Sequence, residues 1–258
     1  MSSNSQLNYW DSQSTVSRYK ARPEHLYTAE RRLLGLLRNR WPQVEMLDLG
    51  VGGGRTTSYF AELAARYVGA DFSPNMIDTC KRRYADRFTN ATFNVADATN
   101  LSDFRDGEFD LVMFSFNSID CLTKAARFQA LREMQRVCRP GGFVFFSSHN
   151  LYNIPLINQF HFQAHPMRLR DELNRWLAVK RKNMPLAEAM CQESYVRYYD
   201  DTIGENFLIF SRPEKQHADL ISMGLKDVRL FSVLNGEELT LDQATSPHQS
   251  WVYYLCSR

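Results

Sequence analysis

The chain has 258 residues, of which 44% are hydrophobic and 23% charged, a composition typical of a globular protein with a sizeable core. Its 31 basic and 29 acidic side chains leave a net charge of +2, which argues against a dedicated nucleic-acid-binding protein with a dense positive field. No run of about 18 apolar residues occurs, so we expect neither a membrane span nor a membrane partner.

The N-terminus and the cysteines bear on location. The first residues lack the basic and apolar regions of a secretory signal. The five cysteines are scattered, odd in number and without a CxxC pair, which disfavours a disulfide framework and a metal site. These features predict a cytoplasmic protein without a bound metal.

Two segments precede the first predicted strand. Residues 1–22 are polar but include Tyr9, Trp10 and Tyr19. Exposed tails rarely hold so many aromatic residues, so this segment is expected to dock on the body, either by simple apolar contact or as a flap over a ligand. Residues 23–40 have apolar side chains at helical spacing and predict a helix.

Strands and helices then alternate. The predicted strands are apolar runs at residues 47–49, 67–71, 91–95, 109–115 and 142–148. The intervening helices are expected at about residues 56–65, from Ser73-Pro74 onward, and at residues 124–138. This alternation predicts an α/β sheet with helices on both faces.

The rhythm breaks after residue 150. Residues 150–185 are predicted to be helical and basic, which indicates either a solvated helix face or a lid over the acceptor site that favours an anionic substrate. Strands are expected within residues 195–210, a helix at 212–223, and a final strand pair at 228–233 and 251–256. The chain is thus predicted to be one domain, 1–258, whose parts are an N-terminal flap and helix (1–40), a core (44–150), a lid (150–200) and C-terminal strands with a helix (201–258).

A glycine-rich loop follows the first predicted strand, in the stretch Asp48-Leu-Gly-Val-Gly-Gly-Gly54. Glycine tolerates φ > 0 and has no side chain, so a ligand can lie directly against such a loop. A strand, a glycine turn and a helix N-terminus together form a nucleotide cradle. A dinucleotide loop would need glycine or alanine at position 55, where this chain has Arg55, so an NAD site is disfavoured.

Polar residues close the later strands, at the edge where ligands bind in such sheets. Asp71 ends the second strand and can accept hydrogen bonds from ribose hydroxyls, while Asp97-Ala98 after the third can address an adenine edge. Ser115-Phe116-Asn117 after the fourth can line a reacting centre. Alternatively, Asp71 is a helix-start acid and Asp97 a turn residue. Their order and spacing together favour a nucleoside site.

The combined pattern resembles the class I S-adenosylmethionine-dependent methyltransferases over roughly residues 44–150. The motifs that carry the resemblance are Asp48-x-Gly50-x-Gly52-x-Gly54, Ala70-Asp71-Phe72-Ser73, Asp97-Ala98, Phe109-Asp110-Leu111-Val112 and Arg139-Pro140-Gly141-Gly142. The resemblance implies a Rossmann-like sheet of seven mostly parallel strands, an antiparallel C-terminal pair and a helical lid inserted after the fifth strand. It also implies S-adenosylmethionine as cofactor and S-adenosylhomocysteine as product.

The family's binding roles can be carried onto matching positions. Gly50, Gly52 and Gly54 would pack against the methionine portion and ribose of the cofactor, and Asp71 would hold the ribose hydroxyls. The adenine and the sulfonium would be contacted by Phe72, Met76, Asp97, Ala98 and Ser115. Tyr19 matches no fixed motif; it is included because the N-terminal segment covers the cofactor in many small-molecule members.

Two residues are candidates for catalysis. Methyl transfer needs alignment of nucleophile, methyl carbon and sulfur, and a base only where the nucleophile must lose a proton. Asp120 follows the fourth strand and His149 the fifth, so either can serve as base or orienting group. A structural hydrogen-bonding role for His149 is an equal alternative.

The acceptor class can be narrowed. Asn117-Ser118-Ile119-Asp120 lacks the Asn/Asp-Pro-Pro-Tyr motif of methyltransferases that act on exocyclic amines of bases, and the Pro-Cys of cytosine C5 enzymes is also absent. We therefore expect a small-molecule nitrogen or oxygen acceptor and no nucleic-acid partner, with the oligomeric state left open. An NAD-linked oxidoreductase and a non-catalytic cofactor-binding protein are the alternatives.

Overall fold

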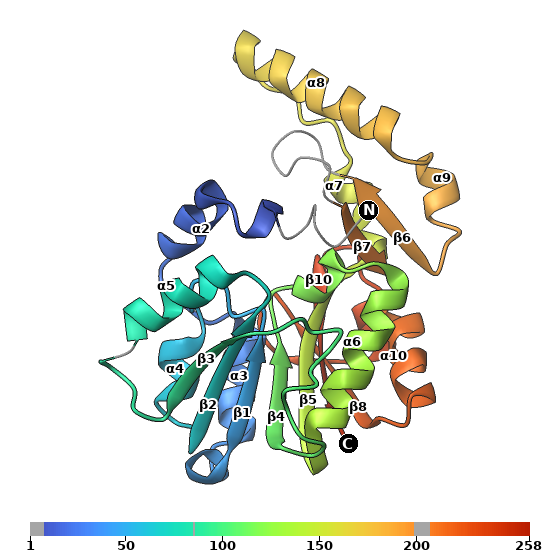
Figure 1. Cartoon of the computed structure of the whole chain (residues 1–258). Coiled ribbons are helices and arrows are strands. Elements are labelled where there is room, and N and C mark those ends of the chain that lie inside the picture. The colour runs from blue at the N-terminus through green and yellow to red at the C-terminus, as the bar shows by residue number, and fades with distance from the viewer. Residues whose placement is uncertain (1–7, 85, 199–206) are drawn as a thin grey trace.

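A sheet of ten strands forms the centre of the molecule, and helices cover both of its faces (Figure 1). The computed structural model describes residues 8–84, 86–198 and 207–258. The strand order is β3-β2-β1-β4-β5-β10-β8-β9, and β7 pairs with both β5 and β6. Seven of these strands correspond to the expected seven-stranded sheet, the strands expected within 195–210 join it as the β6–β7 hairpin, and β9 was not expected.

The strands of the sheet run mostly parallel. The parallel strands on one side are β1 (Glu45–Leu49), β2 (Arg66–Asp71), β3 (Ala91–Val95), β4 (Phe109–Phe114) and β5 (Cys138–Asn150). The antiparallel end consists of β10 (Trp251–Ser257), which pairs with β5 and with β8 (Lys226–Ser232). The predicted fold class, including the antiparallel C-terminal pair, is confirmed. β5 starts earlier than expected because the segment 139–142 continues the strand rather than ending a helix.

Side chains that alternate along the strands divide the core into two clusters. In β1, Met46 packs into one cluster and Leu47 into the other. The helices over the first cluster are α3 (Thr28–Leu36), α4 (Thr57–Ala61) and α5 (Pro74–Tyr84). Those over the second are α6 (Lys124–Val137), α10 (Pro213–Ser222) and α11 (Leu241–Ala244). Both faces of the sheet are therefore buried, as parallel strands require.

The N-terminal segment docks on the body through α2 (Gln13–Lys20) and the residues before it. The Asp11 carboxylate accepts hydrogen bonds from Ser73 Oγ (2.6 Å) and from the backbone N–H of Asn75 (2.9 Å) at the start of α5. Residues 8–22 are thereby fixed against the carboxyl edge of the sheet, whereas residues 1–7 of the expected flap lie outside the described residues.

Helices of 3 to 17 residues and a hairpin follow β5. They are η3 (Leu151–Asn153), α7 (Ile154–Ile157), α8 (Pro166–Lys182), α9 (Leu186–Ala189), β6 (Ser194–Tyr198) and β7 (Phe207–Ser211). A small cluster that includes Leu151, Tyr195 and Phe210 anchors this insertion. The two strands expected within 195–210 are present, although residues 199–206 lie outside the described residues. Figure 1 shows α8 beyond the carboxyl edge of the sheet, standing apart from the glycine loop.

Three further observations bear on the exclusions made from the sequence. None of the described helices combines the length and the apolar character that a membrane span requires. The five cysteines, all within the described residues, form no disulfide. In the same ranges no group of three or more metal-binding side chains comes together.

Candidate active site

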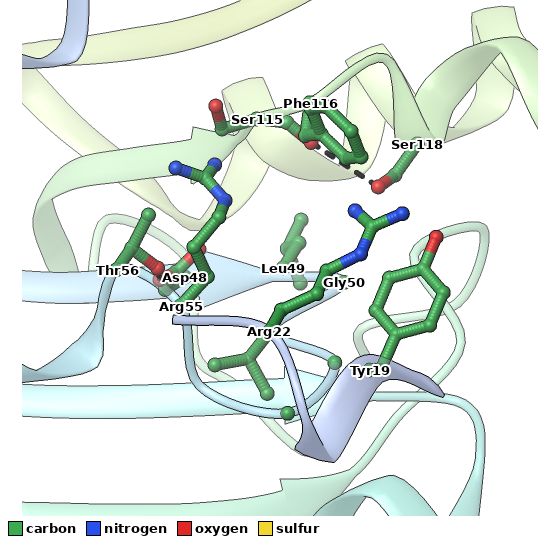
Figure 2. Close-up of a pocket in the computed structure, with 13 residues that line it drawn as sticks. Tyr19, Arg22, Asp48, Leu49, Gly50, Arg55, Thr56, Ser115, Phe116 and Ser118 are labelled. Atoms are coloured by element: carbon green, nitrogen blue, oxygen red, sulfur yellow. Dashed lines mark hydrogen bonds between the residues drawn. The ribbon is translucent and has the colours of Figure 1, made fainter. Parts of the chain in front are cut away.

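A hollow of about 450 Å³, including its part open to solvent, lies at the carboxyl ends of β1 and β4 (Figure 2). Gly50 and Gly52 form part of its lining in left-handed conformations, with φ of +62° and +54°. A Cβ atom at Gly50 would lie 2.9 Å from the Phe114 ring, and one at Gly52 would lie 3.3 Å from the Tyr19 ring. The loop therefore needs glycine at both positions, for conformation and for close approach.

Contacts at Gly54 and Asp71 hold the glycine loop in place outside the lining of the hollow. Gly54 has φ +82° and faces Tyr84, whose hydroxyl donates to the Gly54 carbonyl (2.6 Å). The Asp71 carboxylate accepts the backbone N–H groups of Gly52 (2.9 Å) and Ser73 (3.0 Å). Burial raises the pKa of Asp71 to about 6. Neither Gly54 nor Asp71 is part of the described lining of the hollow.

The residues expected at the adenine lie outside that described lining as well. Met76 is buried in α5, whereas Phe72 and Ala98 are half-buried. Asp97 is exposed, and its Oδ1 accepts the N–H and the hydroxyl of Thr99, both at 2.8 Å. Asp97 thus forms the turn that was weighed as the alternative to an adenine contact.

A strained turn follows β4 and has the hollow on one side. Phe116 and Asn117 have φ of +57° and +58°, a conformation that is unfavourable for a side-chain-bearing residue and unusual for a bulky aromatic one. Phe116 lines the hollow and stacks on Tyr27, with ring centroids 5.4 Å apart. Asn117 instead approaches His149, with Nδ2 3.4 Å from Nε2. The turn therefore links the hollow to the histidine.

His149 is oriented by Asp120, which lies in η2 (Ser118–Cys121). The fully buried Asp120 carboxylate lies 2.7 Å from His149 Nδ1 and accepts the backbone N–H of His149 (2.6 Å). It also accepts the Ser148 hydroxyl (2.9 Å) and forms an ion pair with Arg127. This arrangement assigns the proton of the neutral ring to Nδ1 and leaves the lone pair on Nε2.

The chemistry of this arrangement is specific. Nε2 of His149 can take a proton from a neighbouring group, whereas the Asp120 oxygens are already engaged by a guanidinium, a hydroxyl and the histidine. Asn117 Oδ1 is buried and has no hydrogen-bond partner among the described residues, so it is open to a donor. The structure thus brings together both residues expected to be catalytic, with the Asp120 carboxylate against Nδ1 of His149.

Comparison with known proteins agrees with this geometry. Residues 46–142 match a family described as "Methyltransferase domain". Residues 46–142 therefore form a methyltransferase domain, within the part of the chain whose motifs resemble the class I S-adenosylmethionine-dependent family. The cofactor of this family is S-adenosylmethionine.

Curated relatives match stretches of about one hundred residues of this chain. A demethylmenaquinone methyltransferase of Clavibacter sepedonicus is 34% identical over 116 residues, which cover 44% of this chain and 44% of that protein. One of Beutenbergia cavernae is 39% identical over 101 residues, or 39% of each chain. The matches therefore span less than half the length of these relatives.

Solved structures share the fold along most of the chain. An S-adenosylmethionine-dependent methyltransferase from Clostridium acetobutylicum aligns over 89% of this chain and 90% of its own, with a TM-score of 0.61 and 13% identity. A structure described as a DhpI–SAM–HEP complex aligns over 99% and 97%, with a TM-score of 0.57 and 20% identity. At these identities the likeness establishes the fold of the methyltransferase domain.

Glu30, which the sequence analysis missed, contacts two residues that line the hollow. Arg55, used there only to exclude a dinucleotide loop, binds the fully buried Glu30 through two hydrogen bonds of 2.6 and 2.7 Å. Glu30 also accepts the Tyr27 N–H (2.8 Å) and the Ser115 hydroxyl. One carboxylate thus joins α3, the glycine loop and the end of β4. The only sequence signal was its place three residues into a helix, where a capping-box glutamate stands.

Arg22 was missed too. Its guanidinium lines the hollow 4.4 Å from the Tyr19 ring centroid and 5.1 Å from that of Phe116. Figure 2 shows it beside Tyr19 and directed toward Ser118. In the described part of the chain no carboxylate pairs with it. A cation that faces a hollow without a counter-ion suits an anionic group of a ligand.

Proposed function

We propose that this protein transfers the methyl group of S-adenosylmethionine to a nitrogen or oxygen nucleophile of a small molecule by in-line displacement. The observation that carries the proposal is the Phe116–Asn117 turn. On one side lies a glycine-lined hollow with the unpaired Arg22, and on the other lies His149 oriented by Asp120. A donor site and an acceptor site are thus adjacent.

The residues around the hollow fit the cofactor. The bound cofactor supplies a methyl group that its sulfonium already activates. Arg22 would bind the methionine carboxylate, since none of the described carboxylates pairs with it, and the backbone at Gly50 and Gly52 would pack against the methionine portion. Tyr19 and Phe116 would exclude water from the hollow.

Asp71 would hold the ribose hydroxyls, with Ser115 flanking the sulfonium. Asp71 retains acceptor capacity for this, because each carboxylate oxygen can accept more than the one N–H it receives here. Phe72 and Met76 would lie against the adenine, and Asp97 and Ala98 would address its edge.

On the acceptor side, His149 Nε2 would take the proton that a hydroxyl or an ammonium must lose as it attacks. Asp120 keeps Nδ1 as the donor and favours the imidazolium that results. The buried Asn117 Oδ1 would accept a hydrogen bond from the nucleophile and so align it.

The relatives support a small-molecule acceptor. Those named demethylmenaquinone methyltransferases act, by name, on demethylmenaquinone, a small molecule rather than a nucleic acid. Because the match covers under half of their length, their substrate enters here only as a compound to test. The basic helix α8, which follows β5, is part of the region 150–200 that we propose as a lid for that acceptor.

Calorimetry with S-adenosylhomocysteine and with NAD tests the cofactor, and methyl transfer from labelled S-adenosylmethionine to a metabolite panel that includes demethylmenaquinone tests the reaction. We expect binding of S-adenosylhomocysteine only, and a labelled product. Binding of NAD alone would indicate the oxidoreductase alternative. Binding of S-adenosylhomocysteine without turnover on any acceptor would indicate a non-catalytic cofactor-binding protein.

Replacing Asp71 with alanine tests the ribose assignment. The change removes a charged acceptor, so S-adenosylhomocysteine should bind roughly tenfold or more weakly. Asp78→Ala, which removes an exposed acid from the helix that follows Asp71, is the matched control. An unchanged dissociation constant in Asp71→Ala would remove this residue from the cofactor site.

A further inference from the structure

Helix α8 is the least packed long helix of the described chain. Of its 17 residues, Val179 alone is buried. Trp176 is half-buried and rests edge-on against Phe160, with ring centroids 6.0 Å apart. Glu172 is held on the inner side, where it bonds to Arg175 (2.6 and 2.7 Å). The remaining surface of the helix faces solvent.

The exposed surface of α8 carries one mixed stripe. Met167, Arg170, Leu173, Leu177 and Arg181 follow one another at three- and four-residue spacing, so they lie on one side of the helix. The three apolar members are 63%, 44% and 40% exposed in chain order, and both arginines are exposed. We call these five residues the α8 stripe. It contains no acidic residue.

Charge is concentrated on this helix. α8 carries six basic and two acidic side chains, while the whole chain has 31 and 29. The other 25 basic and 27 acidic residues therefore leave a small negative balance elsewhere. Lys180 lies over the Trp176 ring at 3.6 Å, next to the stripe. Phe162, in the segment that leads into the helix, is 77% exposed.

We propose that α8 docks the protein on an anionic lipid surface, with the α8 stripe inserted at the interface. Exposed leucines and methionine interleaved with arginines, and aromatic residues beside them, are the composition of a helix that lies in the plane of a membrane. Its positive charge complements anionic headgroups. The expectation of no membrane partner rested on the lack of a span, which an interfacial helix does not need.

The stripe fits a lipid surface better than a protein partner. Its apolar side chains lie along a ridge with an arginine on each side of the leucine pair, so a protein partner would need a groove with matching anions at fixed positions. A fluid interface accepts such a ridge without a fixed match. Figure 1 also shows α8 beyond the carboxyl edge of the sheet. Docking through α8 would therefore bring this edge toward the lipid.

Vesicle co-sedimentation of the full chain tests the proposal. The probes are vesicles of equal parts phosphatidylglycerol and phosphatidylcholine, and vesicles of phosphatidylcholine alone. The test variants are Leu173→Glu with Leu177→Glu, and Arg170→Glu with Arg181→Glu. We expect partition onto the anionic vesicles, its loss in about 0.5 M salt, and an at least tenfold decrease in each double variant.

Matched controls separate a docking surface from a general change in charge or apolarity. Leu63→Glu with Ile221→Glu removes two equally exposed apolar residues elsewhere, and Lys81→Glu with Arg82→Glu reverses two exposed cations on α5. Both controls should bind as the wild type does. The arginine variant keeps the test decisive should the leucine variant fail to fold.

Three results would overturn the proposal. One is the absence of binding to anionic vesicles, and another is equal binding to neutral ones. The third is an equal decrease in the control variants. Loss of a dimer in the α8 variants by light scattering, without vesicle binding in the wild type, would show instead that the stripe contacts a second copy of this chain.

Discussion

Two buried carboxylate–arginine pairs lie on opposite sides of the Phe116–Asn117 turn. Glu30 and Arg55 stand on the side of the hollow, and Asp120 and Arg127 on the side of His149. Each carboxylate is fully buried and accepts further hydrogen bonds from neighbouring groups. Burying such a pair costs desolvation that only good geometry offsets, so neither is explained by stability alone.

The two pairs differ in their remaining partners. Glu30 binds a helix-cap N–H and the Ser115 hydroxyl, which do not titrate near neutral pH, so this pair fixes the shape of the glycine loop and the end of β4. Asp120 binds a histidine ring whose other nitrogen is able to accept a proton. A buried carboxylate–arginine pair thus fixes the glycine loop in one place and orients the His149 ring in the other.

The largest expected effect is on catalysis. His149→Gln should lower kcat by about 10²–10⁴-fold, the usual contribution of a positioned base, while S-adenosylhomocysteine binds as before. His217→Gln on α10 is the matched control. Steady-state kinetics and calorimetry measure the two effects, and full activity of His149→Gln would leave this histidine a structural role.

The second effect is on folding. Glu30→Ala leaves Arg55 buried without its partner, so the free energy of unfolding should fall by about 3–5 kcal/mol in urea titration. Replacing both residues with methionine should recover much of this loss, because no buried charge then remains. Glu62→Ala, at an exposed site, is the control. A Glu30→Ala loss no greater than that of the control would contradict the anchoring role of the pair.

Asp48 is a third buried carboxylate, and among the described residues it forms no ion pair with an arginine, unlike Glu30 and Asp120. Asp48 accepts the hydroxyls of Thr56 (2.6 Å) and Tyr67 (2.7 Å), and burial raises its pKa from 3.8 to about 6. The folded state therefore holds this proton more tightly than the unfolded state does. The resulting stability is complete below pH 3.8 and is lost as the pH rises through 6.

The measurement compares Asp48→Asn with the wild type. As the pH rises from about 4 to 7, the wild type should lose on the order of 2–3 kcal/mol of unfolding free energy relative to the variant. The contribution of Asp71 to the pH dependence is the same in both proteins, so it cancels in the difference between their unfolding free energies. A difference that stays constant with pH would show that Asp48 has no raised pKa in the folded state.

The smallest effect concerns the arginine without a carboxylate. Arg22→Met keeps an apolar stem but removes the charge that would bind the methionine carboxylate, so S-adenosylhomocysteine should bind about tenfold more weakly, with folding unchanged. Lys20→Met, at the exposed end of α2, is the control. If calorimetry gives both variants the wild-type affinity, the cofactor's carboxylate lies elsewhere.

Local pattern was enough to predict the fold and to select candidate site residues. Apolar runs and glycine turns repeat over short distances, so the strands, their order of succession and the positions of Gly50 and Gly52 followed from the sequence. His149 and Asp120 were candidates for the same reason, since each closes a strand or follows it closely.

Only the tertiary structure decided which charges meet. Glu30 and Arg55 are 25 residues apart, and Ser115 lies 85 residues beyond Glu30, so no local period signals their contact. Arg127 is buried on α6, where it meets Asp120 and Gln216 of α10, which lies 89 residues further along the chain. The packing of distant segments sets which polar groups lose water, and that choice makes some of them anchors and leaves Arg22 free to meet a ligand.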